Sequence, residues 1–371
     1  MKTIRRLLYL DIVASVGFVA AAFLSLFFFI DFVDELDSVG QHGRTAWHAA
    51  AGALLELPGH FYELFPIAVL IGTIYSLARM AQSSEFTILR TGGLGPQRAL
   101  GLLAVLGVAF GVLTFIVGDF VAPATERQAV LLKARTSGGL KFGGAGAWLK
   151  DRTPDGERSS SVNVAGTGGN GLLEGIRIFE FNADGRLVRR IEARQGKVGA
   201  NGDWALADAD VTGWPLAAAG ADGSPVAIDE QRHARFDWPS TMSAAVVAAA
   251  VLPVGTMTTL DLWRYSEHLS GQEQAAQRYQ IQFWKKALYP LACLVMVALA
   301  LPFAYMHARS GGISLKVFGG IMLGISFVLL NNVAGHLGLL RDWTPWIAAA
   351  TPSGIYLLLS LAAFWWLVRY R

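Results

Sequence analysis

The stretch LDIVASVGFVAAAFLSLFFFI, residues 10–30, decides the fold of this chain, because Asp11 is its only charged residue. A helix needs about 20 mostly apolar residues to cross a hydrocarbon core roughly 30 Å thick. The stretch therefore predicts a membrane-spanning helix. It is longer than the apolar part of a cleavable signal peptide, and no small-residue cleavage site precedes Asp31, so we expect the helix to be retained.

Further windows of the same apolar character follow along the chain. They lie at residues 61–77, 99–120, 287–305, 315–334 and 346–368. Only 16% of the 371 residues are charged, against about 25% in soluble globular proteins. The sequence therefore predicts six transmembrane helices, three before and three after a long polar insert.

The polar insert, residues 121–286, carries the pattern of β-strands. IRIFEFNADGRLVRRIEA alternates apolar and polar residues on either side of Asn-Ala-Asp-Gly, which is a hairpin signal, and DWALADADVTGW and HARFDW alternate again. We predict a polytopic α-helical membrane protein with an inserted all-β, jelly-roll-like domain and flanking helices. The domains are then residues 1–120 with three spans, the insert, and residues 287–371 with three more.

Basic residues in the short loops predict the orientation of the spans. One side of the membrane receives Lys2, Arg5, Arg6, Arg79, Arg90, Arg98, Arg309, Lys316, Arg369 and Arg371. The short loops of the other side contain only Arg44 and Arg341. The positive-inside tendency places both termini in the cytoplasm and the insert on the opposite face. These loops also account for the net charge of +3, so we expect no nucleic-acid partner.

Motifs of self-contained catalysis are absent from the sequence. Gly196-Lys197 is followed by Val198 and lacks the earlier glycine of a phosphate-binding loop, and there is no His-Glu-x-x-His or Gly-x-Ser-x-Gly pattern. The single cysteine, Cys293, lies in an apolar window and is expected to be a small core residue. We therefore predict a chain that is not an enzyme and binds no metal or cofactor of its own.

The loop between the second and third spans contains a short predicted helix, residues 84–91. Ser84 can cap a helix that starts at Glu85, and Gly92-Gly93 can end it after Arg90. Phe86 and Leu89, three residues apart, form an apolar side. Two interpretations are open: a helix that lies on the lipid headgroups, or one that docks in a groove of a cytoplasmic partner.

Three segments together resemble the LptF/LptG family of lipopolysaccharide permeases, and its LptG half more than its LptF half. They are EFTILRTGG (85–93), DFVDEL (31–36) and SGQEQAAQRYQIQFWKKALYPL (270–291). Each segment is only moderately specific, but their order and spacing, with the arrangement of three spans, β-domain and three spans, extend the resemblance over nearly the whole chain.

The resemblance implies a function and a set of partners. It implies the permease subunit of an ABC transporter that extracts lipopolysaccharide from the Gram-negative inner membrane and passes it to a periplasmic bridge. The expected partners are an LptF-like permease forming a heterodimer with this chain, an LptB-like ATPase dimer that binds ATP and Mg, a bitopic LptC-like protein and an LptA-like bridge. The β-domain would then be periplasmic.

The resemblance also implies a role for the short cytoplasmic helix. By analogy it is the coupling helix through which the ATPase drives the permease. Glu85 would contact the ATPase, Phe86 and Leu89 would fill its groove, and Arg90 would lie at the end of the contact.

Two further groups of residues are candidates for contacts with the lipid. The family places a lysine just before the FVD motif, where this chain has Asp31, an acid that cannot attract a phosphate unless a divalent cation bridges the two. Cations that could replace it at the membrane rim are Lys133, Arg135, Arg278 and Lys286. Their alternative role is ordinary interfacial charge.

An apolar cavity for acyl chains would be lined by residues of the first and fifth spans. The candidates are Phe23, Phe27, Phe28, Phe327 and Leu330. The alternative is that such side chains face the lipid of the bilayer. A different class of function is also open: a non-transporting membrane scaffold whose β-domain recruits envelope-assembly partners. Sparse charge within the spans suits lipid rather than ion transport.

Overall fold

The computed structural model describes residues 2–37, 39–40, 45–93, 95–136, 140–141, 147–152, 158–167, 172–199, 203–214, 228–240, 242, 254–268, 273–305 and 312–369. These residues form two compact units. The helical unit comprises Met1–Glu35, Ala53–Glu126 and Thr258–Arg371, and the β-unit comprises Leu36–Gly52 and Arg127–Met257.

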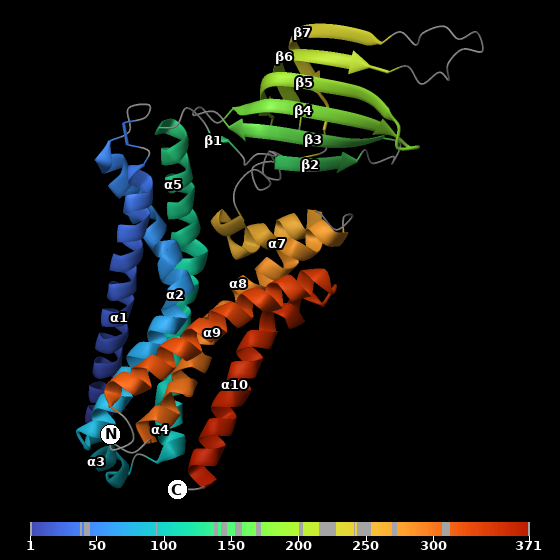
Figure 1. The fold of residues 1–371 in the computed structure, drawn as a ribbon. Helices are drawn as coiled ribbons and strands as arrows, with labels where there is room; N and C mark the ends of the chain where they lie inside the picture. The colour runs from blue at the N-terminus through green and yellow to red at the C-terminus, as the bar shows by residue number, and fades with distance from the viewer. Residues whose placement is uncertain are drawn as a thin grey trace. The chain divides into compact units, whose positions relative to one another are not determined.

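Long helices make up most of the helical unit (Figure 1). In chain order, the helices of the described residues are α1 (Lys2–Leu36), α2 (Ala46–Gln82), α3 (Glu85–Thr91), α4 (Pro96–Ile116), the π-helix η2 (Val117–Val121), α5 (Ala122–Thr136), the 3-10 helix η3 (Val254–Thr256), α7 (Thr259–His268), α8 (Glu273–Tyr305), α9 (Ile313–Leu340) and α10 (Pro345–Arg369). Among the described residues, six helices are long and apolar enough to cross a membrane, which confirms the six predicted spans.

The helices extend well beyond the apolar windows of the sequence. The predicted second span, residues 61–77, is the centre of a continuous helix from Ala46 to Gln82. The third span continues through η2 into α5, as Pro96–Lys133. Helix α7 and the first turns of α8, which the sequence analysis grouped with the insert, belong to the helical unit. Hydropathy locates the lipid-crossing part of a helix, whereas the ends are set by packing and capping.

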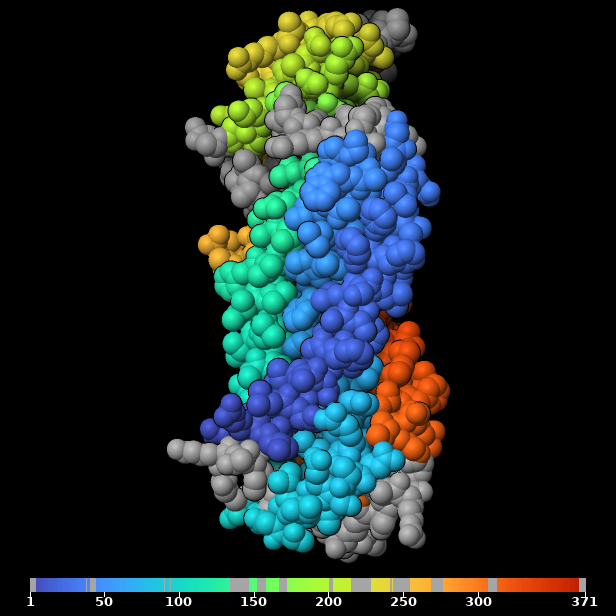
Figure 2. Space-filling model, turned by 90° about the vertical axis from the view of Figure 1, so that its left-hand side faces the viewer, coloured from blue at the N-terminus to red at the C-terminus, as the bar shows by residue number. Residues whose placement is uncertain are grey.

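Small residues bring the helices of this unit into close contact. A Cβ added at Gly72 of α2 would lie 2.6 Å from the backbone nitrogen of Val16 in α1. A Cβ at Gly111 of α4 would lie 2.8 Å from the carbonyl oxygen of Pro290 in α8. Such glycines allow helix backbones to approach each other where burial of apolar surface gives no driving force between helices. In Figure 2 the surface of α1, in dark blue, runs across that of α2, in lighter blue.

A single apolar cluster forms the core of the helical unit. It includes buried side chains of α1, α2, α4, α8 and α9. Cys293 of α8 is buried there, with its Sγ 3.2 Å from the hydroxyl of Thr114 in α4. The prediction of a small core cysteine is therefore confirmed.

The described strands of the β-unit form one antiparallel sheet, visible in Figure 1 as a strongly curved layer. Its described strands are β1 (Leu140–Lys141), β2 (Ala147–Arg152), β3 (Arg158–Thr167), β4 (Leu173–Asn182), β5 (Leu187–Val198), β6 (Trp204–Gly213) and β7 (Asp229–Trp238). From β3 to β7 each strand pairs with the next, while β1 and β2 pair with successive parts of the same edge of β3. The predicted all-β insert is confirmed, and the described strands are joined as a meander.

The predicted hairpin around Asn-Ala-Asp-Gly joins β4 to β5. The amide of Asn182 donates to the carbonyl of Arg186, and the amide of Arg186 donates back to the Asn182 side chain at 2.8 Å. Gly185 has φ +75°, a left-handed conformation that glycine adopts without steric cost. The turn is followed by the pair Phe181 and Leu187, and after a register shift between Glu180 and Phe181 the strands pair Ile178 with Ile191 on the buried face of the sheet.

Candidate functional site

The short helix between the second and third spans is present as α3, from Glu85 to Thr91. Glu85 occupies its first turn, where a carboxylate interacts favourably with the positive end of the helix. The Gly92 amide donates to the carbonyl of Ile88 at 2.9 Å, and Gly93 has φ +97°. The predicted stop at the glycine pair is therefore confirmed. Ser84 has φ +62°, so it does not adopt the extended conformation of a usual N-cap.

The apolar side of α3 packs on the chain itself, which corrects the predicted role of Phe86. Phe86 is only 3% exposed, and its ring meets that of Tyr305 edge-on at 5.2 Å between centroids. Its side chain is therefore not presented to a partner's groove. Leu89 is half-buried against the same core, and its contact with a partner stays a prediction. The side chain of Arg90 lies outside the described part of the structure.

The exposed side of α3 instead carries Glu85, Thr87 and Ile88. Ile88 is 66% exposed, so most of its side chain is accessible to a partner. The sequence analysis gave Ile88 no role in a partner contact, because spacing shows which side chains share a face and does not show which face points inward.

We expect the two apolar residues of α3 to respond differently to truncation. Phe86→Ala removes a buried ring and should lower the free energy of unfolding by about 3–5 kcal/mol. Ile88→Ala removes an exposed side chain and should change it by no more than about 0.5 kcal/mol. Thermal unfolding of the detergent-purified protein compares the two variants. Equal losses would contradict the inward orientation of Phe86.

A polar network lies between α1 and α2. Ser76 of α2, which is fully buried, donates its hydroxyl to Asp11 of α1 at 2.5 Å, and Arg79 pairs with the same carboxylate. This pairing explains why the only charge in the first apolar window is tolerated there. Since Arg79 is in the last turn of α2, the network joins α1 to the segment that leads into α3.

The four predicted rim cations have different surroundings. Lys286 of α8 lies with its Nζ 4.0 Å from Asp119, and both side chains are only 13% exposed. This internal ion pair corrects its prediction as a free phosphate ligand. Arg278 of α8 is exposed and Lys133 of α5 is half-buried, while the side chain of Arg135 is outside the described residues. Lys133 and Arg135 belong to the β-unit, and Arg278 and Lys286 to the helical unit.

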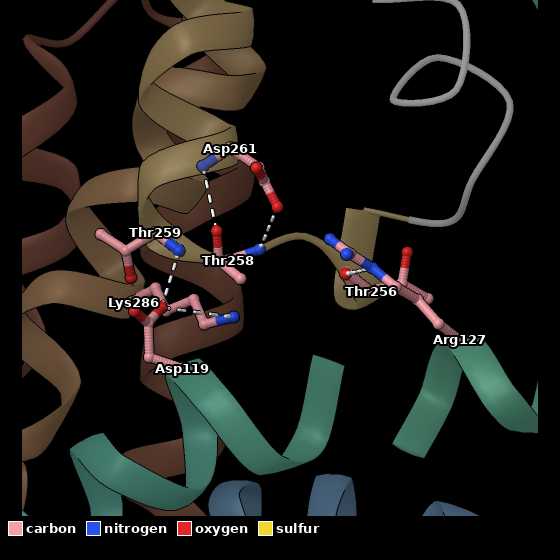
Figure 3. Close-up of polar contacts among 7 residues, drawn as sticks. All are labelled: Asp119, Arg127, Thr256, Thr258, Thr259, Asp261 and Lys286. Atoms are coloured by element: carbon pink, nitrogen blue, oxygen red, sulfur yellow. Dashed lines mark hydrogen bonds and ion pairs between the residues drawn. The ribbon is translucent and has the colours of Figure 1, made fainter. Parts of the chain in front are cut away.

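Asp119 also positions the start of α7 (Figure 3). It lies in the π-helix η2, and its Oδ1 accepts the amide of Thr259 at 2.7 Å. Thr258, the residue before the start of α7, forms a reciprocal pair of hydrogen bonds with Asp261, of the capping-box type. The Asp261 amide donates to the Thr258 hydroxyl, and the Thr258 amide donates to the Asp261 carboxylate. Within the β-unit, the Arg127 guanidinium donates to the Thr256 carbonyl at 3.0 Å.

The Asp119 contacts predict a specific defect in α7. Asp119→Ala leaves the amide of Thr259 and the ammonium of Lys286 without this partner, at a cost of about 1–3 kcal/mol for a buried group. We expect faster amide hydrogen exchange in α7 and little change in α10, read by mass spectrometry. Asp119→Asn keeps an acceptor oxygen for the Thr259 amide, so its effect on α7 should be smaller; equal exchange in both variants would contradict the role.

The predicted acyl-chain residues divide between core and periphery. Phe327 is 2% exposed and meets Tyr356 of α10 edge-on, so it is a core residue, which corrects its prediction as a cavity lining. Phe23 and Leu330 are half-buried and pack on the core. Phe28 stacks on Phe32 of the same helix. The most exposed aromatic side chains of α1 are Phe18 and Phe29, which the sequence analysis did not select.

Asp31 has a partner that the sequence analysis did not foresee. Its Oδ2 lies 2.8 Å from Nε2 of His60 in α2, and Glu56 lies close to both. The Phe27 ring packs against the His60 imidazole at 4.7 Å between centroids. The relevant signal in the sequence was the spacing of Glu56 and His60, four residues apart on one helix face.

Comparisons with known proteins agree with this architecture. The family described as lipopolysaccharide export system permease LptF/LptG matches residues 6–369. The lipopolysaccharide export system permease protein LptG of Escherichia coli K12 is 28% identical over 349 residues, covering 93% of this chain and 92% of that protein. The LptG protein of Haemophilus influenzae is 25% identical over 347 residues, covering 92% and 91%. With a match that extends over nearly its whole length, the chain belongs to the LptF/LptG family of lipopolysaccharide export permeases.

Proposed function

We propose that this chain is an ATP-driven permease subunit that extracts lipopolysaccharide from the inner membrane and passes it to a periplasmic bridge. The observation that carries the proposal is α3: within a family of lipopolysaccharide permeases, this chain exposes an acid and an isoleucine on a short helix between two spans. A charged group beside an apolar side chain suits a helix that docks in a partner's groove.

In this proposal, ATP hydrolysis by partner subunits supplies the free energy for transport. An LptB-like ATPase dimer binds ATP and Mg and contacts α3 through Glu85 and Ile88. An LptF-like permease completes the membrane pathway as a heterodimer, an LptC-like bitopic protein attaches to the pair, and an LptA-like bridge receives the lipid. The chain itself performs no covalent chemistry, so its work is a gated conformational cycle.

The connections of α3 within the chain suit the transmission of that work. Phe86 is inserted into the core beside Tyr305 of α8, so a displacement of α3 acts directly on α8. Helix α2 begins the same connection, and its last turn is tied to α1 through Arg79 and Asp11. A displacement of α3 would thus reach α8 through the buried Phe86 ring, and α1 through the ion pair at the end of α2.

The residues proposed to contact the lipid are those of the predicted set that remain after Lys286 and Phe327 are excluded. Arg278, Lys133 and Arg135 are the cations proposed to meet phosphate groups, with Asp31 treated below. The residues proposed to contact acyl chains are Phe23, Phe27, Phe28 and Leu330. Both termini and α3 are then cytoplasmic and the β-unit is periplasmic, as the distribution of basic loop residues indicates.

Purification from a Gram-negative host tests the proposal. The tagged chain should bring with it an ATPase dimer and a second permease in fixed stoichiometry, and mass spectrometry should find lipopolysaccharide in the purified complex. Reconstituted into liposomes, the complex should release that lipid only when ATP and Mg are supplied. Recovery of envelope-assembly proteins without an ATPase or lipopolysaccharide would favour the scaffold function instead.

A further inference from the structure

Three potential metal ligands converge from α1 and α2. The nearest ligand atoms of Asp31, Glu56 and His60 all lie within 4.8 Å of one another, and Asp31 Oδ2 lies 2.8 Å from His60 Nε2. All three residues belong to the helical unit. Ligand atoms at about 2.1 Å from one ion lie no more than about 4.2 Å apart, so a shared ion requires only small side-chain movements.

The helices hold these side chains in place before any ion arrives. Glu56 and His60 are four residues apart on α2 and therefore project from the same side of that helix. Asp31 is supplied by α1, which packs along α2 through the close approach of Val16 to Gly72. The ring of Phe27 packs on His60 and limits the orientations of the imidazole. The arrangement is thus preorganised by packing on rigid elements.

Two members of this group lie mostly out of contact with water. The Asp31 and His60 side chains are only 15% and 24% exposed, and buried charges in proteins are paired or bind metal ions. A divalent cation neutralises both carboxylates while His60 is neutral, the form in which imidazole is a metal ligand.

The donor set also indicates which class of ion fits. One imidazole nitrogen with two carboxylate oxygens suits Zn²⁺, which accepts both nitrogen and oxygen ligands, whereas Mg²⁺ and Ca²⁺ prefer oxygen ligands alone. Three protein ligands leave one position of a tetrahedral zinc ion open for a further ligand. A cation also reverses the local sign of charge, so a site built from acids becomes able to attract an anion.

We propose that Asp31, Glu56 and His60 bind a zinc-type divalent cation whose open position takes a phosphate oxygen. The second half rests on the proposed function, in which that phosphate belongs to the transported lipid.

Zinc binding by the purified complex tests the first half without any transport assay. The complex is prepared without a histidine tag, stripped with a chelator and titrated with Zn²⁺ in a calorimeter. We expect one ion per chain, and at least about tenfold weaker binding in Asp31→Asn, Glu56→Gln and His60→Gln. Asp34→Asn, an exposed acid on the same helix, is the matched control and should bind like the unaltered protein.

X-ray absorption of the zinc-loaded complex should show one imidazole nitrogen among light-atom ligands, and the His60→Gln variant should lose that nitrogen. Absence of stoichiometric binding, or equal binding by the three ligand variants and the control, would overturn the metal site. The unfolding temperature of each variant is measured in the presence of chelator, where no zinc is bound. A value equal to that of the unaltered protein shows that the variant is folded and that only zinc binding is lost.

The phosphate half is tested separately, by adding either inorganic phosphate or lipopolysaccharide micelles to the zinc-loaded complex. Tighter zinc retention with lipopolysaccharide, absent in His60→Gln, supports a lipid phosphate as the fourth ligand. An effect of inorganic phosphate alone identifies free phosphate instead and overturns the lipid assignment. If neither addition changes zinc retention, the phosphate half of the proposal is wrong. These measurements do not involve transport, so the proposed permease function is tested separately.

Discussion

Replacing Glu85 with lysine is expected to reduce ATP-driven lipopolysaccharide release by at least about tenfold while the chain still folds. Glu85 is exposed in the first turn of α3, so the substitution removes no buried contact of the core. Placing a like charge opposite a partner's cation costs several kcal/mol, and about 1.4 kcal/mol corresponds to a factor of ten. Release from liposomes, measured beside ATP hydrolysis by the same complex, should show turnover that no longer moves lipid.

Two further variants separate the contact from other effects of the charge. A lysine in the first turn of a helix is itself unfavourable by about 0.3–1 kcal/mol, because it lies at the positive end of the helix dipole. Glu85→Gln adds no positive charge there and should reduce lipid release less than Glu85→Lys does. Glu230→Lys makes the same change of charge on exposed β7 and should leave coupling intact. If Glu85→Lys releases lipid at the normal rate, α3 does not couple through this residue.

The architecture was predictable because it depends on average hydropathy and on short-range patterns. The six spans follow from apolar windows that are long enough to cross a bilayer, and all six are present as helices. The hairpin at Asn182–Arg186 follows from one turn signal between two alternating segments. Both kinds of signal are local in the sequence, so no knowledge of distant contacts was required.

The site was less predictable because its contacts join distant parts of the chain. Lys286 is paired with Asp119, and Asp31 is paired with His60. No short-range pattern in the sequence predicts either pair. Phe86 and Leu89 were correctly assigned to one face of α3, but that face packs on Tyr305 and its neighbours. Amphipathic spacing is the same whether a helix docks on its own chain or on a partner, so Ile88 could be identified as the exposed apolar residue only from the structure.

Replacing Gly72 with alanine is expected to cause a substantial loss of stability although it adds only one methyl group. The new Cβ would lie 2.6 Å from both the backbone nitrogen and the Cα of Val16, and neither atom can move without moving α1. Overpacking of a close interface costs about 1–3 kcal/mol even where side chains can adjust. The displacement would also strain the bond from Ser76 to Asp11, one helical turn farther along α2. We expect a lower unfolding temperature in detergent and reduced accumulation in membranes.

Gly101→Ala provides the matched control for this effect. Gly101 also lies within a predicted span, in α4, but nothing comes within 4 Å of a Cβ at that position. The same methyl group should therefore be neutral there, or stabilising by up to about 1 kcal/mol through the better helix propensity of alanine. Because both variants change hydropathy equally, a difference between them isolates the steric contact of α1 with α2. Equal unfolding temperatures would show that α1 can separate from α2 at Val16 without cost, and the close helix crossing would then not be required for stability.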